Sequence, residues 1–117
     1  MTLFSQFFHK ASIPQLDAAQ VSARLSRPGA PFLLDVRQPE EYREGHIAGA
    51  RLIPLNELAS RMGELPPSRE IVCVCRSGSR SGVAARQLTA AGLAAANLRG
   101  GMLAWKGAGL PLKKGTP

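Results

Sequence analysis

Short apolar runs alternate with stretches of helical spacing along most of this chain, and this alternation limits its fold more than any other feature. The runs at 31–36, 71–74 and 93–98 have the length and composition of buried strands. The segments at 15–26 and 81–91 place their apolar residues at helical spacing instead. Strands that alternate with helices build a mostly parallel sheet covered by helices on both faces. The sequence therefore predicts an α/β domain.

Shorter elements fill the intervals between these segments. Pro14 suits the first turn of the helix predicted at 15–26. Asn56 is a residue type that caps helix starts, so we expect it to cap a short helix that runs to residue 62. The other predicted elements are one or two helical turns at 39–43, a weak strand at 50–53 and a final helical turn or two at 102–106.

The length of 117 residues predicts a single domain with its own core. We expect an N-terminal arm at 1–11, a folded domain at 12–112 and a flexible tail at 113–117. The start of the chain is a poor secretory signal, because its apolar stretch is short and its lysine follows that stretch. No apolar run approaches the length of a membrane span, so we expect no membrane partner.

The chain is strongly basic, with a formal net charge of +7 and a pI of about 10.5. Such a balance fits nucleic acid, a membrane surface or small anions as partners. The basic residues form no run of five or more, and the few aromatic residues do not interleave with the arginines. A stacking surface for single strands is therefore not visible. We predict a local anion site and no nucleic-acid partner.

Cys73 and Cys75 are the only cysteines. They are too close in sequence for a useful structural disulfide, and two cysteines do not make a secreted disulfide framework. We therefore predict a reducing, cytoplasmic location. A metal site built from these cysteines with His9 and His46 is rejected, because the histidines are remote and the ligand spacing is wrong. No metal or cofactor is expected.

The segment from Cys75 to Ser81 combines several features of a reactive thiol. Sites in open α/β sheets form at the carboxyl ends of strands, and Cys75 ends the strongest predicted strand. A loop with a glycine and two serines can point its amides inward, and the following helix start adds positive potential. Arg76 and Arg80 add two charges, and all these features favour the nucleophilic thiolate.

Each residue of this segment also has a purely structural interpretation. A cysteine at a strand end is often part of the core, the glycine and serines can form an ordinary turn, and the arginines can be solvated. The coincidence of all these features within seven residues favours a nucleophile at Cys75. Cys73 lies inside the strand, so core packing is its preferred interpretation.

Four stretches of the chain resemble the single-domain rhodaneses, and together they extend from about residue 13 to 112. The four stretches are LLDVRQPEEYREGHIAGARLIP at 33–54, IVCVCRSGSRS at 71–81, AARQLTAAG at 84–92 and LRGGMLAWKGAGLPL at 98–112. The resemblance implies a rhodanese fold, in which a central parallel sheet of about five strands is flanked by helices on both faces.

The resemblance also implies an activity like that of thiosulfate sulfurtransferases. Cys75 would accept sulfane sulfur as a persulfide and pass it to a thiophilic acceptor. Arg37 would help to bind an anionic donor, and Arg76 favours an oxyanion such as thiosulfate. The loop residues that would hold the donor and the transferred sulfur are Arg76, Ser77, Gly78, Ser79 and Arg80, with Arg80 closing the loop against the helix start.

Other residues of the matching stretches are expected to be structural. Asp35 and Glu41 would hold the end of the first long strand and its following helix, while His46 and Trp105 would pack. The implied partners are a small anionic sulfur donor and a thiol or cyanide acceptor. A protein that accepts sulfur is a further candidate partner.

Two other functions compete with this interpretation. Cysteine phosphatases and arsenate reductases place five residues between their cysteine and arginine, but only four separate Cys75 from Arg80. No acidic residue beside the loop suggests itself as a general acid. A rhodanese-like domain that only binds a partner is the other alternative, although such domains often lack the cysteine that this chain retains.

Overall fold

The computed structural model describes residues 12–117, which form a central sheet of five strands. The strands lie in the order β1-β5-β4-β2-β3, and every neighbouring pair is parallel. This arrangement confirms the predicted parallel sheet and places β4 at its centre. The strands are β1 Gln15–Leu16, β2 Phe32–Asp35, β3 Arg51–Leu52, β4 Ile71–Val74 and β5 Ala95–Leu98.

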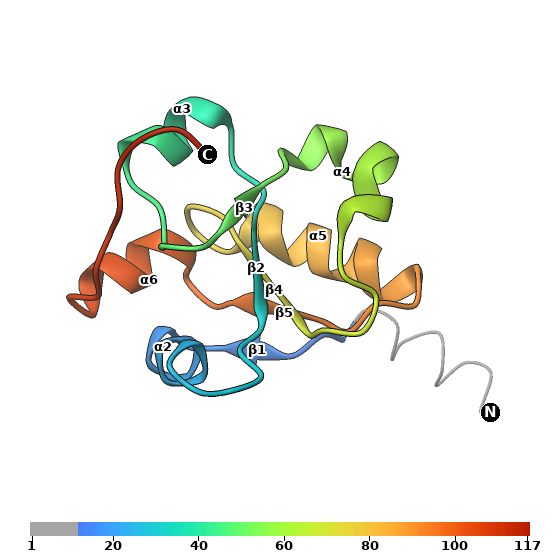
Figure 1. Cartoon of the computed structure of the whole chain (residues 1–117), viewed down its shortest axis with the longest axis horizontal. Helices are drawn as coiled ribbons and strands as arrows, with labels where there is room; N and C mark the ends of the chain where they lie inside the picture. Colours follow the sequence, from blue (N-terminus) through green and yellow to red (C-terminus); the bar gives the residue numbers. More distant parts are fainter. Residues whose placement is uncertain (1–11) are drawn as a thin grey trace.

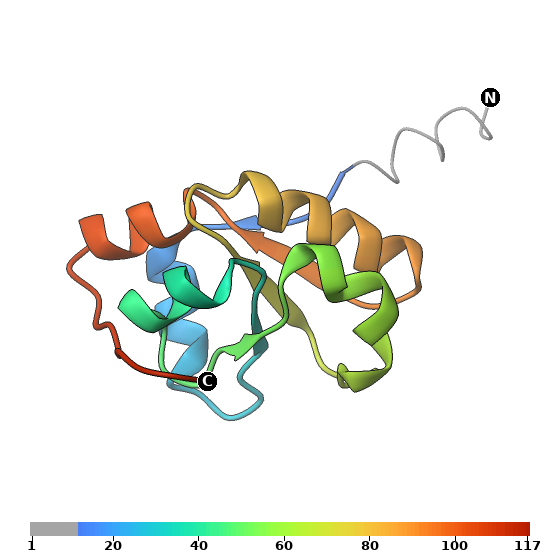
Figure 2. The same cartoon turned by 90° about the horizontal axis from the view of Figure 1, so that it is seen from above.

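Helices cover both faces of the sheet, as the sequence predicts. Helices α2 and α6 lie on one side of the strands, and α4 and α5 lie on the other (Figure 1). The view from above separates the same two groups (Figure 2). The helices are α2 Ala18–Leu25, α3 Pro39–Glu44, α4 Leu55–Arg61, α5 Ser79–Ala90 and α6 Gly101–Gly107, and a 3₁₀ turn follows α4 at Met62–Glu64.

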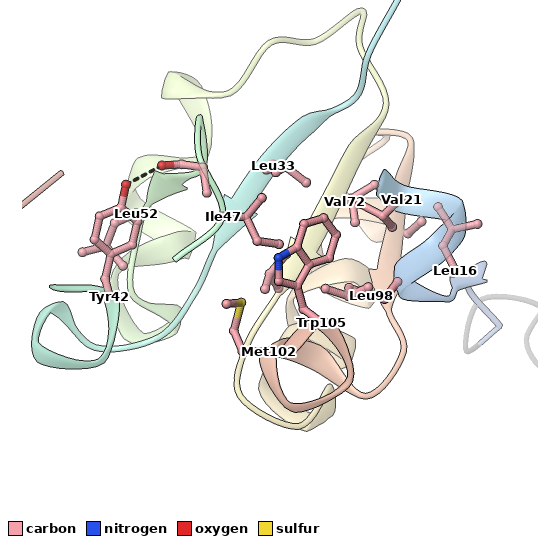
Figure 3. Packing of buried hydrophobic residues seen from close by; sticks show 14 residues of the cluster. Leu16, Val21, Leu33, Tyr42, Ile47, Leu52, Val72, Leu98, Met102 and Trp105 are labelled. Carbon is pink, nitrogen blue, oxygen red and sulfur yellow. Dashed lines mark hydrogen bonds between the residues drawn. The ribbon is translucent and has the colours of Figure 1, made fainter. Parts of the chain in front are cut away.

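The two faces of the sheet carry separate buried clusters. On the α2 and α6 side, Trp105 and Met102 pack with Val72 and Leu98 of the sheet (Figure 3). On the α5 side, Cys73 belongs to the other cluster. Successive side chains of a strand point to opposite faces, so Cys73 and Cys75 point the same way, toward α5. This alternation decides which helix faces the two thiols.

The first predicted helix is wrong at its start. Asp17 accepts a hydrogen bond from the backbone of Gln20 at 2.8 Å, and the Gln20 side chain accepts one from the Asp17 amide. This capping box fixes the start of α2 at Ala18. Gln15 and Leu16 are extended instead and pair with Asn97 and Leu98 of β5. Pro14 therefore precedes a strand and not a helix.

Two further helix starts differ from the prediction. Asn56 does not cap α4, because the chain is already helical at Leu55 and Pro54 occupies the cap position. Helix α5 begins at Ser79, two residues earlier than predicted. Its cap residue is Gly78, whose φ of 98° lies in the left-handed region. That turn allows the chain to enter the helix immediately after the loop.

The ends of the chain bear on the predicted domain limits. The predicted arm at 1–11 lies outside the described residues, and the limits of 12–112 stay a prediction. At the other end, Lys113 and His46 exchange two backbone hydrogen bonds, and Gly115 donates one to Arg43. These bonds hold the first part of the predicted tail against the domain. Within residues 12–117, no helix is long and apolar enough to cross a membrane.

Candidate active site

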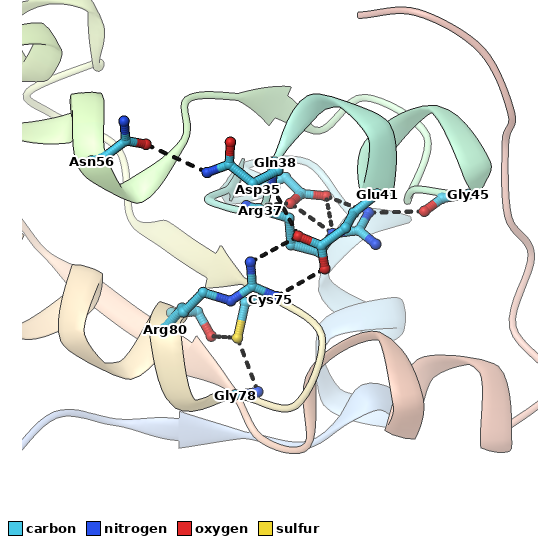
Figure 4. A network of polar contacts seen from close by, with 10 residues as sticks. Asp35, Arg37, Gln38, Glu41, Gly45, Asn56, Cys75, Gly78 and Arg80 are labelled. Carbon is cyan, nitrogen blue, oxygen red and sulfur yellow. Dashed lines mark hydrogen bonds and ion pairs between the residues drawn. The ribbon is translucent and has the colours of Figure 1, made fainter.

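Cys75 directly follows the central strand β4, at the carboxyl end of the sheet. Its backbone is held in place by α6, because the amide of Met102 donates to the Cys75 carbonyl at 2.8 Å. The whole residue is only 1% exposed. Figure 4 shows its sulfur directed toward the loop that leads to α5. This is the site that the sequence predicts for a reactive thiol.

Hydrogen-bond donors surround Cys75 Sγ. The amide of Gly78 donates to it at 3.1 Å, and the hydroxyl oxygen of Ser81 lies 3.2 Å away. Burial by itself raises the pKa of the Cys75 thiol, but the hydroxyl and amide of Ser81 and the amides of Gly78 and Ser77 lower it. The net result is a pKa below the ordinary value of a cysteine. This sulfur cradle, formed by Ser77, Gly78 and Ser81, therefore favours the thiolate.

Two glycines make the close packing of this loop feasible. Gly78 needs its left-handed φ of 98°, and a β-carbon on it would lie 3.2 Å from the amide nitrogen of Gly100. A β-carbon on Gly101, which has a φ of 56°, would lie only 2.3 Å from the Cys75 carbonyl oxygen. A larger residue at Gly101 would therefore push α6 away from the backbone of Cys75.

Arg80 connects the loop to α3. Its guanidinium donates two hydrogen bonds to the carboxylate of Glu41, at 2.8 and 2.9 Å (Figure 4). The sequence interpretation directs Arg80 against the helix start, but its guanidinium instead extends across to α3. Glu41 also accepts a hydrogen bond from the amide of Gln38 at 3.0 Å. Mainly through Arg80, the pKa of Glu41 falls to about 2. Glu41 thereby fixes α3 against the start of α5.

Arg37 is held by Asp35 in a buried ion pair. Its guanidinium donates to both carboxylate oxygens at distances from 2.8 to 3.2 Å, and Nη2 also donates to the Gly45 carbonyl at 2.8 Å. Arg37 is 4% exposed, so most of its charge faces the protein. Within residues 12–117, its Nη1 atom has no hydrogen-bond partner, which leaves one edge of the guanidinium for another group.

A small cavity of about 130 Å³ lies between α3, the loop and α6. Arg37 and Arg76 both line it, as the predicted anion site requires, and Lys106 of α6 adds a third cation. The exposed ammonium of Lys106 was not predicted, because its position after Trp105 carries no signal of its own. Glu41 and Glu44 of α3 also line this cavity. The cavity is therefore polar and of mixed charge.

The remaining predicted loop residues differ in exposure. Ser77 and Ser79 are exposed, and their side chains form no hydrogen bond within the described part of the chain. Ser81 was predicted only as a helix start, yet its hydroxyl contacts the sulfur and donates to Asn97 Oδ1 at 2.6 Å. Asn97 was also missed. The signal for it was a polar residue inside an apolar strand.

The other residues singled out in the sequence have packing roles. Cys73 is completely buried, and this burial together with the charge at Cys75 raises its pKa to about 12. His46 is stacked on Tyr42 with their ring centres 3.7 Å apart. The indole nitrogen of Trp105 donates to the Pro111 carbonyl at 2.9 Å. These contacts confirm that Cys73 belongs to the core and account for the expected structural roles of His46 and Trp105.

Comparisons with known proteins agree with this architecture. The family model of the rhodanese-like domain matches residues 17–108. A sulfurtransferase of Allochromatium vinosum is 38% identical over 101 residues, which cover 86% of this chain and 94% of the relative. These matches include the strand, the loop and the helix that surround Cys75.

Solved structures show the same likeness. A rhodanese-related protein from Thermoplasma volcanium has a TM-score of 0.81 and 30% identity, over 86% of this chain and 97% of that protein. A thiosulfate sulfurtransferase from Pseudomonas aeruginosa also has a TM-score of 0.81, with 32% identity, over 89% of this chain and 21% of its own. With a family model that covers most of its length, this chain belongs to the rhodanese-like domain family.

Proposed function

We propose that this protein is a sulfurtransferase that carries sulfane sulfur as a persulfide on Cys75. The observation that carries the proposal is the sulfur cradle, in which the Gly78 amide and the Ser81 hydroxyl lie within 3.2 Å of Cys75 Sγ. Donors at this position stabilise a negative charge on sulfur. Both the thiolate and a persulfide carry such a charge at neutral pH, so one set of donors serves both states.

In the first half of the reaction, the donor is thiosulfate. The Cys75 thiolate attacks the outer sulfur of thiosulfate, a new sulfur–sulfur bond forms, and the bond to the sulfonate sulfur breaks. Sulfite leaves with the electron pair of the broken bond. The product is a Cys75 persulfide anion, and no proton or external oxidant is needed.

In the second half, a thiophilic acceptor removes the outer sulfur. Cyanide attacks that sulfur and leaves as thiocyanate, and a thiolate acceptor leaves as a persulfide. In both cases the electron pair of the broken bond returns to Cys75 as its thiolate. A protein thiol can serve as acceptor in the same way, provided that it extends far enough to reach the loop.

The charges around the cavity support an anionic donor. Thiosulfate carries two negative charges, and the thiolate adds a third, so their approach needs compensating positive charge. Arg76 and Lys106 are exposed at the cavity, and Arg37 offers the free edge of its guanidinium. The name of the Pseudomonas aeruginosa relative is consistent with this donor class.

Access to the sulfur limits the size of the donor. Cys75 is 1% exposed, and the neighbouring cavity of about 130 Å³ is small. A single sulfur atom at the end of a donor needs only a small displacement of the loop side chains. A bulky electrophile needs a larger one, so we expect small donors and extended acceptors to react best.

A cysteine phosphatase activity is less well supported. An arginine at the end of the loop would have to be free to bind the oxyanion of a phosphate ester. Here the guanidinium of Arg80 already donates two hydrogen bonds to Glu41. We therefore expect no turnover of an aryl phosphate.

Intact mass after incubation with thiosulfate tests the proposal. We expect the wild-type protein to gain one sulfur atom and to lose it again when cyanide is added. Cys75→Ser should gain nothing, and Cys73→Ser is the matched control that should gain the sulfur normally. If Cys75→Ser still gains sulfur, or if no thiosulfate, organic persulfide or mercaptopyruvate loads the wild-type protein, the proposal is wrong.

A further inference from the structure

Asn97 is a buried polar residue in the middle of an otherwise apolar strand. It lies between Ala96 and Leu98 in β5 and is 3% exposed. Asparagine is disfavoured in strands, and a buried amide destabilises the fold unless its hydrogen bonds are satisfied. A residue of this kind at this place therefore needs an explanation in its contacts.

The side chain of Asn97 has a partner for each amide hydrogen and one for its oxygen. Its Nδ2 donates to the Gln15 side chain at 3.0 Å and to the Gly78 carbonyl at 3.1 Å, and its Oδ1 accepts from the Ser81 hydroxyl at 2.6 Å. The Gly78 carbonyl beside the nitrogen and the Ser81 hydroxyl beside the oxygen suffice to fix the orientation of the amide. Two of its three partners, Gly78 and Ser81, are the residues that lie against Cys75 Sγ.

We propose that Asn97 is a positioning residue of the sulfur cradle. It holds Gly78 and Ser81 in the geometry in which both can donate hydrogen bonds to Cys75 Sγ. The inference rests on the proposed role of Cys75 as the nucleophile. Asn97 does not touch the sulfur in this arrangement. It acts through its two neighbours, from a strand that is fixed in the sheet.

The contact with Gly78 restrains the most adaptable residue of the loop. Glycine has the widest backbone freedom of any residue, so hydrogen bonds to its carbonyl restrict the conformations that Gly78 can adopt. The Gly78 carbonyl accepts from the amide of Gly82 at 3.0 Å and from Asn97 Nδ2 at 3.1 Å. A carbonyl oxygen has two lone pairs, and these two bonds use both of them. The Gly78 amide is then directed at the sulfur.

The contact with Ser81 keeps its hydroxyl within reach of the sulfur. The hydroxyl has a single proton and two acceptors, Asn97 Oδ1 at 2.6 Å and Cys75 Sγ at 3.2 Å. When Cys75 is a thiol, the proton lies toward Asn97, and the thiol can donate to the Ser81 oxygen. When Cys75 is a thiolate, the proton can turn toward the sulfur. The bond to Asn97 Oδ1 therefore places the Ser81 oxygen beside the sulfur while Cys75 is a thiol, whereas the bond from Asn97 Nδ2 to the Gly78 carbonyl does not involve this proton and is the same in both states.

The test compares Asn97→Leu with Gln15→Leu. Asn97 and Gln15 are paired in register across β5 and β1, so both variants replace a polar by an apolar side chain at one level of the sheet. Only the first removes the contacts to Gly78 and Ser81. We expect the alkylation rate of Cys75 in Asn97→Leu to fall roughly threefold to tenfold at neutral pH, since about one hydrogen bond to a charged sulfur weakens. Gln15→Leu should leave it unchanged.

Two readouts separate positioning from mere stability. The midpoint of the alkylation rate against pH should move upward in Asn97→Leu, and the Gly78 amide should exchange its hydrogen faster. The charged and titratable groups near Cys75, namely Arg76, Arg80 with Glu41, Asp35 with Arg37 and the thiol of Cys73, are the same in both variants. A change in their titration therefore does not account for a difference between the two.

An unchanged midpoint would overturn the proposal. A lowered midpoint would overturn it as well, since Asn97 would then only compete with the sulfur for the Ser81 hydroxyl. If Asn97→Leu does not fold, Asn97→Ala carries the same expectation and the same contrary outcomes. Alkylation needs no sulfur donor. A protein that alkylates as expected but never forms a persulfide would refute the proposed function and leave the role of Asn97 standing.

Discussion

Cys73 and Cys75 lie two residues apart on the same face of the sheet, yet their surroundings differ completely. Both are buried, at 0% and 1% exposure. Cys73 lies within β4, paired on both sides by the backbones of β2 and β5, and its pKa is raised to about 12. Cys75 lies one residue beyond the strand, where loop donors converge on its sulfur and lower its pKa.

The difference shows that burial does not decide the chemistry of a thiol. Removal of water disfavours the thiolate at both positions. Inside the strand, the backbone amides are already used by neighbouring strands, so none is free to replace that water. Past the strand end, the amides of Ser77 and Gly78 have no strand partner and turn inward. The end of β4 is thus the point where we expect a buried cysteine to become reactive.

The strongest test of this comparison exchanges each cysteine for serine. Cys75→Ser should abolish sulfur transfer and leave the fold intact, because a hydroxyl is a far weaker nucleophile than a thiolate. Cys73→Ser should keep activity and lose about 1–3 kcal/mol of unfolding free energy, because it buries a hydroxyl in an apolar cluster. Thiosulfate turnover and urea unfolding measure the two effects.

The reverse result would identify Cys73 as the reactive thiol. Loss of activity in both variants, with both folded, would mean that the two thiols act together. Either outcome would contradict the conclusion that the thiol beyond the strand end is reactive and the thiol within the strand is not. Circular dichroism of each variant serves as the control for folding.

The second prediction concerns the buried arginine beside the loop. Arg37→Ala leaves the carboxylate of Asp35 buried without its partner, which typically destabilises a protein by about 3–5 kcal/mol. We also expect a higher KM for thiosulfate, because Arg37 lines the cavity and its Nη1 atom has no hydrogen-bond partner within residues 12–117. A stability loss without any change in KM would assign Arg37 to the fold alone.

Much of the fold could be predicted because it depends on local pattern. The strand at 71–74 has the predicted limits, since its apolar run begins after Glu70 and ends where the glycine- and serine-containing loop from Cys75 to Arg80 follows. The prediction is wrong where an element depends on a partner that is distant in the sequence. The two residues of β1 are a strand only because they pair with β5, about 80 positions away in the chain.

The candidate site is visible in the sequence to a similar degree, and its catalytic role stays a prediction. Cys75 and its loop were evident because thiol, glycine and arginines are close in sequence. Ser81 was within the matching stretch but was interpreted only as a helix start, since its hydroxyl reaches the sulfur through the first turn of α5. Asn97 was missed because its contacts with Gly78 and Ser81 span 19 and 16 positions.

The third prediction tests the exposed counterpart of Arg37. Arg76 is exposed at the cavity and has no ion-pair partner within residues 12–117. Arg76→Ala should therefore raise the KM for thiosulfate by roughly tenfold, at the lower end of a charge-assisted contact of about 1.5–3 kcal/mol. The effect should weaken as salt is added, because exposed charges are screened. If the KM for thiosulfate of Arg76→Ala at low salt equals that of the wild-type protein, the donor is less charged, for example an organic persulfide.

The fourth prediction uses the two thiols as reporters in one molecule. Iodoacetamide should modify Cys75 and spare Cys73 in the folded protein, with a rate midpoint below that of an ordinary cysteine, near about 8.5. Peptide mass spectrometry after partial reaction assigns each site. In urea both thiols should react alike. A midpoint at or above the ordinary value would show that the loop donors do not stabilise the thiolate.

The smallest expected effect comes from the ion pair between Glu41 and Arg80, which connects α3 to the loop that follows Cys75. Glu41 has a pKa of about 2 in the folded protein, against 4.5 for the free side chain, mainly because of Arg80. A carboxylate whose pKa is lowered by folding stabilises the fold above its unfolded value. That contribution is lost as the pH falls from about 4.5 toward 2. The pair is partly exposed, so Glu41→Gln should cost only about 0.5–1 kcal/mol at neutral pH.

The pH dependence of this small difference is what identifies its origin. Urea unfolding of wild-type protein and Glu41→Gln should show a gap at pH 7 that narrows below pH 4.5 and closes near pH 2, where the carboxylate has taken up its proton. A gap that stays constant would mean that Glu41 stabilises α3 by packing. The same variant releases the charge of Arg80, which lies close enough to Cys75 to interact with its thiolate. We therefore expect Cys75 to alkylate slightly faster at neutral pH in Glu41→Gln while Cys73 stays unreactive, because only the thiol beyond the strand end is within reach of the loop charges.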